Sequence, residues 1–116
     1  MSFRHRSSAL SILETFRNKA GISNLQHIVA FLYICENEGL CISELRHISG
    51  LSQAGASRSV DFLMRERDGV PPDNAALIRT ERAGKLKSLR LTEAGTALRE
   101  RIDLHIMRST PIAAGW

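Results

Sequence analysis

The apolar residues of this chain recur every three or four positions over most of its length, which is the spacing of amphipathic helices. Between Leu86 and Leu91 the pattern changes, because apolar and polar residues alternate there as they do in a half-buried strand. The sequence therefore predicts a mainly α-helical chain with one small β-hairpin. The expected helices are residues 8–19, 24–38, 44–49, 53–67 and 93–107, and the expected strands are residues 76–81 and 86–91.

Residues that cap or end helices stand at the borders of these segments. Ser23 and Gln26 have the spacing of a capping box, in which two side chains satisfy backbone amides at the start of a helix. Gly39 and Gly50 are expected to end helices in a left-handed conformation. Residues 40–42 form a short apolar link that could add a strand. The other expected N-caps are Ser7 or Ser8, Ser43, Ser52 and Thr92.

Residues 41–67 have the pattern of a helix-turn-helix, and the rest of the chain is organised around them. A short helix is followed by a turn at Gly50 and by a second helix with one apolar and one polar face. In a DNA-binding helix-turn-helix, the second helix enters the major groove while the first crosses the backbone. A plain helical hairpin has the same pattern, so the motif alone leaves both interpretations open.

The polar side of the second of these helices carries residues suited to reading DNA. Ala54 is small enough to allow close approach to the groove. Gln53 can pair with adenine, Arg58 with guanine, and Ser57 with a base or a phosphate. Ser52 at the N-cap leaves backbone amides that can point at a phosphate. These five residues are the expected contacts of a recognition helix that spans residues 53–67.

Positive charge is concentrated beside this motif. The chain has a net charge of +4, and residues 79–90 alone contain five basic residues and one acidic residue. Residues 77–91 are therefore predicted to form a basic ribbon, or wing, that contacts the minor groove or phosphates. A charge run is more often just a solvated face, but the ribbon and the helix-turn-helix together favour DNA binding. The expected wing contacts are Arg79, Arg82, Gly84, Lys85 and Lys87.

Length and composition favour one ordinary globular domain. The chain has 116 residues, which is within the usual length of a single domain. Its two cysteines form no disulfide framework, which indicates a reducing cytosol. No apolar run approaches the ~18–20 residues that span a bilayer, and the first residues lack the apolar stretch of a signal peptide. We therefore expect a cytoplasmic protein that has no membrane contact.

Candidate catalytic chemistry is sparse. The four histidines are scattered, and no Ser-His-acid set, phosphate loop or carboxylate pair stands out, so we expect neither an enzyme nor a bound cofactor. Cys35, Cys41 and His47 lack a C-x₂-C pair and a fourth ligand, so no metal site is expected. Cys35 on an apolar helix face is expected in the core. A sensor role for the Cys41 thiol remains an alternative, and it would require an exposed thiolate.

Four stretches of the sequence resemble the winged-helix transcription regulators of the MarR family. They are ISELRHISGLS, SRSVDFL, LIRTE and LRLTEAGTAL, and the last is similar to the LTxxG transition from wing to helix in that family. The resemblance covers the chain from about Ile22 to Leu98. It implies a homodimer that binds palindromic promoter DNA, usually as a repressor and often relieved by a small-molecule effector. It places base reading on residues 53–58 and the wing role on residues 79–87.

The resemblance also implies how the chain is divided. Residues 1–21 would be an N-terminal arm and a first helix used for dimerisation, residues 22–98 the winged-helix domain, and residues 99–116 the end of the C-terminal helix and a tail. The chain ends about where the last dimerisation helix of the family would begin, so dimerisation would rest on the first and last helices. The expected dimer contacts are Leu10, Leu13, Phe16, Ile102 and Ile106.

Two further departures from the family concern the wing. Glu81 and Arg82 stand where an Asp-Arg pair is common, which makes Arg82 the expected reader at the wing tip. The loop at residues 68–74 is longer than is usual between the recognition helix and the wing.

The sequence thus predicts a winged helix-turn-helix that acts as a dimeric, sequence-specific regulator of transcription on double-stranded DNA. The alternatives are a winged helix that binds another protein and a non-specific DNA binder. The electrostatic character of the recognition face separates the first two: basic residues there favour DNA, and an apolar patch favours a protein partner.

Overall fold

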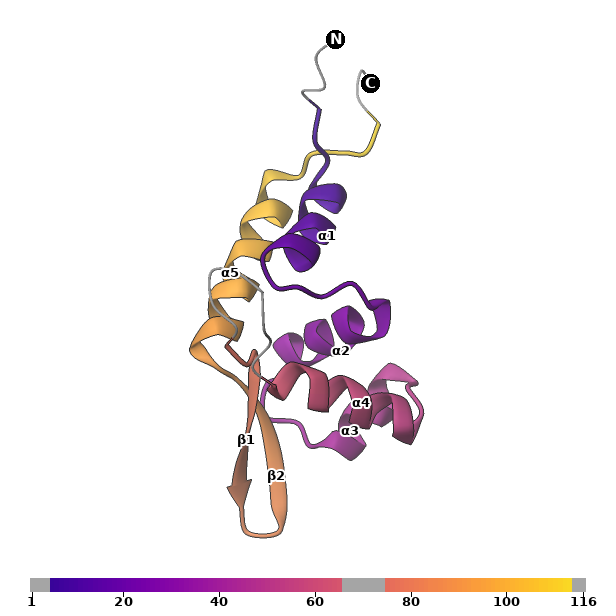
Figure 1. Cartoon of the computed structure of the whole chain (residues 1–116), viewed down its shortest axis with the longest axis vertical. Helices are drawn as coiled ribbons and strands as arrows, with labels where there is room; N and C mark the ends of the chain where they lie inside the picture. The colour runs from indigo at the N-terminus through magenta and orange to yellow at the C-terminus, as the bar shows by residue number, and fades with distance from the viewer. Residues whose placement is uncertain (1–4, 66–74, 114–116) are drawn as a thin grey trace.

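The computed structural model describes residues 5–65 and 75–113, and this part of the chain folds into five α-helices and a two-stranded antiparallel sheet (Figure 1). The predicted class, mainly helical with one hairpin, is therefore confirmed. The elements are α1 (Ser8–Asn18), α2 (Leu25–Glu36), α3 (Ile42–Ser49), α4 (Gln53–Met64), β1 (Ile78–Ala83), β2 (Leu86–Leu91) and α5 (Glu93–Arg108).

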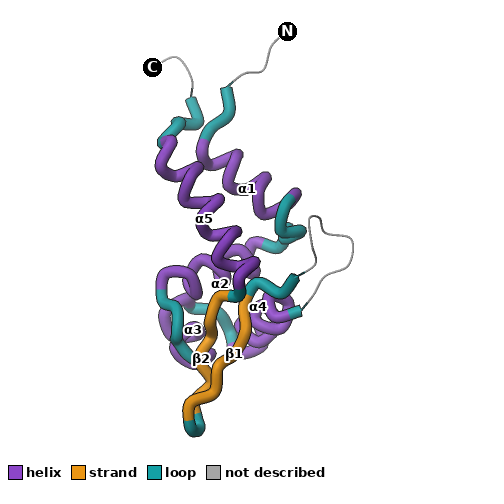
Figure 2. The backbone as a smooth tube through the Cα atoms, turned by 90° about the vertical axis from the view of Figure 1, so that its left-hand side faces the viewer, coloured by secondary structure: helices purple, strands orange, loops and turns teal. Residues whose placement is uncertain are grey.

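The elements are arranged along one long axis, with overall extents of 57 × 30 × 23 Å. Helices α2, α3 and α4 and the root of the hairpin form a compact body (Figures 1 and 2). Helices α1 and α5 lie side by side and project from one end of this body, while the hairpin projects from the other end. Backbone hydrogen bonding ties the start of α1, far from the body, to the chain after α5, since the Ser8 amide donates to the Thr110 carbonyl at 2.9 Å.

The helices begin at capping side chains, three of them where the sequence predicts. The hydroxyls of Ser7, Ser52 and Thr92 accept hydrogen bonds from amides in the first turns of α1, α4 and α5. The prediction for α2 is wrong: Asn24, not Ser23, is the cap, and its Oδ1 accepts from the Gln26 amide at 2.8 Å. Asparagine is as good an N-cap as serine. Capping propensity therefore does not show which of two neighbouring candidates begins the helix.

Helix α3 also begins earlier than expected. Cys41, not Ser43, occupies its N-cap, because the Glu44 carboxylate accepts a hydrogen bond from the Cys41 amide at 2.9 Å. The link at residues 40–42 is consequently not a strand, and Ile42 is already helical. Leu40 nevertheless accepts a backbone hydrogen bond from Leu89, and Gly39 donates one to Leu89, so this link is fastened to the hairpin.

The hydrophobic core is centred on α2, where this helix packs against its neighbours. Phe31 and Ile34 of α2 are fully buried, and the Phe31 ring meets Phe16 of α1 edge-on at a centroid distance of 6.0 Å. Leu25, at the start of α2, is exposed. The remaining fully buried large apolar residues are Ile22, Leu45, Leu63, Ile78 and Leu89.

The hairpin differs from its prediction in the position of its first strand. Strand β1 runs from Ile78 to Ala83, rather than over residues 76–81, and pairs with β2 in the register Ile78↔Leu91 to Ala83↔Leu86. The turn therefore contains only Gly84 and Lys85, and Gly84 adopts a φ of 65°, which suits glycine. The outer part of the hairpin extends beyond the helical body (Figure 1).

Gly95 explains why α5 can follow the hairpin so closely. A Cβ atom at this position would lie 2.0 Å from the carbonyl oxygen of Leu77, which is far inside any tolerated contact. That same carbonyl accepts a hydrogen bond from the Thr92 amide, and the Thr92 hydroxyl donates to the Ala76 carbonyl at 2.5 Å. The TEAG segment thus fixes the first turn of α5 against the start of β1.

Candidate nucleic-acid interface

Helix α4 presents an exposed face at its N-terminal half. Its first turn is held by Ser52, whose Oγ accepts from the Gly55 amide at 3.0 Å. The side chains of Gln53, Ala54 and Arg58 are exposed and that of Ser57 is partly exposed. The opposite face is buried and consists of Gly55, Ala56, Ser59, Val60 and Leu63. The structure therefore brings the five predicted recognition residues onto one accessible side of the helix.

The extent of this helix is less than expected. Regular helix ends at Met64, and Arg65 at the C-cap is extended, whereas the sequence predicts helix to residue 67. Met64, the last residue of the helix, is 36% exposed. Residues 66 and 67 and the loop at residues 68–74 lie outside the described residues. Gly55 is buried, and a Cβ there would lie 3.1 Å from Ser52 Oγ.

The opposite side of α4 is held by a residue that sequence reasoning did not single out. His27 of α2 places its Nδ1 atom 2.7 Å from the Oγ of Ser59. Its ring stacks on Phe62 with a centroid distance of 4.5 Å and an interplanar angle of 21°. Burial, helped by the charges of Arg58 and Arg65, lowers the pKa of His27. Two α4 residues one turn apart thus contact a single imidazole.

The hairpin has two faces with different electrostatic character. Residues alternate between faces along a strand, so Ile78, Leu89 and Leu91, which are buried, define the face that packs on the helices. Arg82 and Lys87 belong to the same face but lie beyond the body, near the tip, where both are exposed. They stand directly opposite each other in the strand register. Like charges in that position repel, and a bound anion would relieve the repulsion.

The other face of the hairpin is partly neutralised. Glu81 Oε2 lies 3.2 Å from Nη1 of Arg79 and 3.9 Å from Nε of Arg90. The Arg90 guanidinium also packs on the link after α2, since a Cβ at Gly39 would lie 3.2 Å from its Nη1. Arg79, predicted as a wing contact, therefore shares its charge with a carboxylate. Within residues 75–113, Arg82, Lys85 and Lys87 form no ion pair, so they are the wing cations available to a ligand.

Helix α4 and the hairpin lie at the same end of the molecule. In Figure 1 the hairpin and the α3–α4 pair occupy the end opposite to α1, with the hairpin beside the two helices. The cations Arg58, Arg82, Lys85 and Lys87 are all exposed on these elements. No large apolar residue on the N-terminal half of α4 is exposed, while Leu86 is the one such residue of the described hairpin. This end of the described structure thus carries exposed cations, together with the exposed apolar residues Ile42 and Ile48 of α3 and Met64 at the end of α4.

The predicted dimer contacts divide into two groups. Leu10, Leu13 and Ile106 are exposed by 47%, 52% and 53%, and they lie on the projecting pair α1 and α5. Phe16 and Ile102 are buried within the chain itself, at 0% and 3% exposure, so their side chains are not available to a second chain. The helical spacing of apolar residues in the sequence does not show which side of α1 packs on α5 and which side stays exposed.

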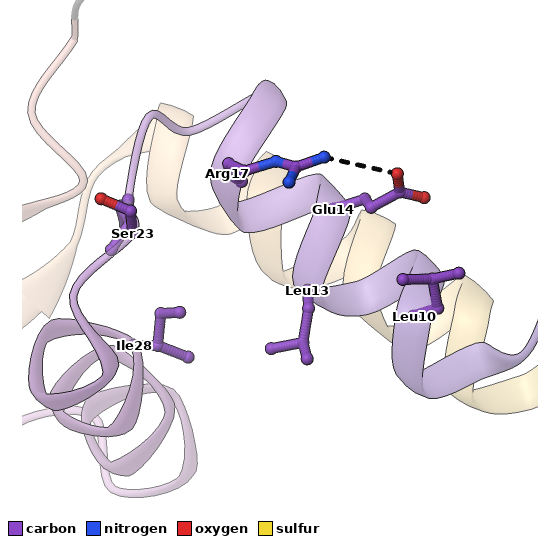
Figure 3. A pocket seen from close by; sticks show the side chains of 7 residues that line it. Leu10, Leu13, Glu14, Arg17, Ser23 and Ile28 are labelled. Carbon is purple, nitrogen blue, oxygen red and sulfur yellow. Dashed lines mark ion pairs between the residues drawn. The ribbon is translucent and has the colours of Figure 1, made fainter. Parts of the chain in front are cut away.

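A hollow of about 430 Å³ lies between α1 and the start of α2. Figure 3 shows Leu13 and Ile28 facing the same space, with Glu14 and Arg17 at its rim. The carboxylate of Glu14 lies 3.5 Å from the Arg17 guanidinium and also pairs with Arg6.

The cysteines occupy unlike environments. Cys35 is partly buried, and this burial raises the pKa of its thiol to about 12. The Cys41 Sγ lies 3.2 Å from the Ser43 hydroxyl at the start of α3. No group of three histidine, cysteine or acidic residues that could hold a metal ion occurs among the described residues. None of the described helices is long and apolar enough to cross a membrane.

Several solved structures share this architecture. A MarR transcriptional regulator from Methanosarcina mazei superimposes with a TM-score of 0.63 at 13% identity, covering 87% of this chain and 62% of that one. A MarR-family regulator from Silicibacter pomeroyi superimposes with a TM-score of 0.57 at 26% identity, and the match covers 85% of this chain and 62% of that one. The fold is that of the MarR-like winged-helix regulators. The predicted resemblance is confirmed at the level of structure.

A third structure of this fold is the Staphylococcus aureus MarR in complex with salicylate and kanamycin, with a TM-score of 0.63 at 22% identity and coverage of 86% and 62%. This chain thus spans less than two thirds of the length of each of these three regulators. The sequence matches no protein-family model and no curated protein.

Proposed function

We propose that this protein is a sequence-specific regulator of transcription that binds double-stranded DNA as a homodimer and acts as a repressor. Helix α4 enters the major groove, which is about 12 Å wide, and Gln53, Ser57 and Arg58 contact base edges. The wing lies along the minor groove or its phosphates, with Arg82, Lys85 and Lys87 as the contacts.

One observation carries this proposal: the polar face of α4 and the wing cations that form no ion pair among the described residues lie at the same end of the molecule. A winged helix that docks on a protein would need an apolar patch there. No large apolar residue is exposed on the N-terminal half of α4, although Ile42 and Ile48 of α3 and Leu86 of the wing are exposed at this end of the molecule. Further exposed apolar residues lie on α1 and α5, at the opposite end, where they fit a second copy of the chain better than DNA.

Dimerisation belongs to the same proposal. Leu10 and Leu13 of α1 and Ile106 of α5 expose apolar surface that a lone chain leaves in water. Leu104 and Met107 of α5 and Ile112 in the segment after it expose further apolar surface, with exposures of 57%, 78% and 77%. Joining two chains through this surface would leave α4 and the wing of both chains free to contact successive turns of one duplex.

A small-molecule effector is a further part of the proposal. The hollow between α1 and α2 has the size of small-molecule sites and carries Arg17 at its rim (Figure 3). It adjoins Leu10 and Leu13, so a ligand there would act on the proposed dimer contact. Salicylate can serve as a probe: a thermal shift that is lost in Leu13→Trp would support this site, and the same shift in that variant would place the ligand elsewhere.

Selection of binding sites from random duplexes, run at two salt concentrations, tests the proposal as a whole. Enrichment of a palindrome, with affinity that falls steeply as salt rises, is the expected result. Binding without enrichment would identify a non-specific DNA binder. No binding at low salt would overturn the proposal and leave the protein-partner alternative.

A further inference from the structure

Helix α4 has one polar side chain buried on its inner face, and this is Ser59, which is fully buried. A buried hydroxyl needs a partner, because leaving it without one costs more than its hydrogen bond contributes when formed. His27 provides that partner from α2, at 2.7 Å. The contact joins residues that are 32 positions apart in the chain, so it fastens one helix to another.

The same imidazole also fixes a second point on α4. Its ring stacks on Phe62, three residues after Ser59 and therefore on the same side of the helix. A hydrogen bond is directional and a stacked pair restricts the ring plane, so the two contacts together define how α4 is rotated about its own axis. Packing of Ala56, Val60 and Leu63 buries the helix but, being non-directional, defines that rotation less sharply.

Rotation of α4 matters because the proposed base contacts are on its other side. Arg58 is the residue directly before Ser59, and it lies close enough to the His27 ring for its charge to act on that ring. A bidentate contact to a base tolerates little displacement, whereas a contact to the phosphate backbone tolerates more. A change at His27 would thus reach Arg58 through Ser59 without touching DNA.

We propose that His27 is a positioning residue: it sets the rotation of α4 at which Gln53, Ser57 and Arg58 meet base edges, and so determines sequence specificity rather than general affinity for DNA. This proposal rests on the proposed function. A half-buried histidine that merely helps the helices pack would affect folding stability and leave specificity unchanged.

Two substitutions separate the contacts that His27 makes. His27→Phe keeps a ring that can stack on Phe62 and removes the hydrogen bond to Ser59. His27→Asn keeps a polar atom near the position of Nδ1 and removes the ring. Ser59→Ala removes the same hydrogen bond from the other side. Ile102→Val serves as a matched control, since it loosens the core in α5 at a residue that is 3% exposed.

The measurement is the ratio of affinities for a selected duplex and a scrambled duplex, taken by fluorescence anisotropy at a temperature where circular dichroism shows each variant folded. We expect His27→Phe and Ser59→Ala to lower this ratio by roughly tenfold, with affinity for the scrambled duplex changed by less than about twofold. The double variant should lose no more than either single variant. His27→Asn should retain more of the ratio than His27→Ala.

An unchanged ratio in both His27→Phe and Ser59→Ala would overturn the proposal. An equal fall in Ile102→Val would also overturn it, because the effect would then follow stability alone. If the wild-type chain itself does not distinguish the two duplexes, the proposed function fails and this inference fails with it. That failure is seen before any variant is made, so the two results are distinguishable.

Discussion

At the scale of single residues, Arg58 is the side chain most suited to recognising a base. It is exposed on α4, and a guanidinium can donate two parallel hydrogen bonds to guanine. We expect Arg58→Ala to weaken specific binding by about 1–3 kcal/mol and to relax the preference at one base position. Arg58→Lys, which keeps the charge but loses the bidentate geometry, should relax the same position with a smaller loss of affinity. Site selection with each variant gives the comparison, and an unchanged preference in both would remove Arg58 as a reader.

The imidazole of His27 also makes stability depend on pH. Its pKa in the folded chain is lower than its ordinary value of 6.5, chiefly because of burial and then because of Arg58 and Arg65. The unfolded chain therefore binds this proton more readily, so the contribution of His27 is complete above about pH 6.5 and declines as the pH falls below it. Urea unfolding at several pH values should show a larger decline for the wild type than for His27→Phe. Parallel curves for the two proteins would contradict this assignment.

The two thiols should differ sharply in reactivity. A thiol with a pKa near 12, as burial gives Cys35, contains almost no thiolate at neutral pH. We expect a thiol-specific reagent to label Cys41 in the folded protein and to label Cys35 only after unfolding. Cys41→Ser then serves as the control, and rapid labelling of that variant under native conditions would contradict the prediction.

At the scale of elements, most of the helix-turn-helix could be predicted from the sequence because its signals are local. The hydroxyl of Ser52, the left-handed Gly50 and the apolar period of α4 each act within one turn of helix. The contact between His27 and Ser59 could not be predicted, because nothing within either helix specifies which residues face each other. The burial of Phe16 and Ile102 within the chain depends likewise on how α1 meets α5.

The wing shows the same division between local and non-local information. Its basic charge and its alternating strand are visible in the sequence, but the register is needed to see which cations share a face. In the strand register, Arg82 stands opposite Lys87. Arg79, by contrast, forms an ion pair with Glu81. Two cations that are equivalent by sequence thus become unequal as contacts to DNA.

This difference predicts unequal effects on salt dependence. Lys87→Ala should lower affinity about equally for all sequences and reduce the slope of log K against log salt by about 1, because one phosphate contact is lost. Arg79→Ala should reduce the slope less, since Arg79 shares its charge with Glu81. Titrations at four salt concentrations measure both slopes. Equal reductions would show that the ion pair opens when DNA binds.

The junction between wing and α5 depends on a residue with no side chain. Gly95→Ala would place a methyl group 2.0 Å from the Leu77 carbonyl oxygen, so either the helix or β1 must move. We expect a loss of roughly 2–4 kcal/mol in the free energy of unfolding, well beyond the small gain that alanine gives inside a helix. Glu93→Ala, exposed in the same turn, is the control and should change stability by less than about 1 kcal/mol. Equal stability of Gly95→Ala and wild type in urea would contradict the contact.

At the scale of the whole molecule, the separation of α4 and the wing from the projecting pair α1 and α5 predicts how assembly and DNA binding are coupled. Leu13, which is 52% exposed on α1, lies in the surface proposed to join two chains. Leu13→Glu would bury a charge there and should weaken the dimer by about 100-fold or more, as sedimentation equilibrium would show. Leu86→Glu places the same charge on an equally apolar residue of the wing, 64% exposed, and should leave the dimer intact.

The two variants should then fail on DNA in different ways. A chain that cannot dimerise keeps its own α4 and wing, so Leu13→Glu should still bind a half-site weakly but gain nothing from a second, correctly spaced half-site. Leu86→Glu should remain sensitive to half-site spacing while its affinity falls through repulsion from phosphates. If Leu13→Glu stays dimeric, the chains must meet elsewhere. If it becomes monomeric yet keeps full affinity for the palindrome, two-fold symmetry has no part in recognition, and each winged helix reads DNA on its own.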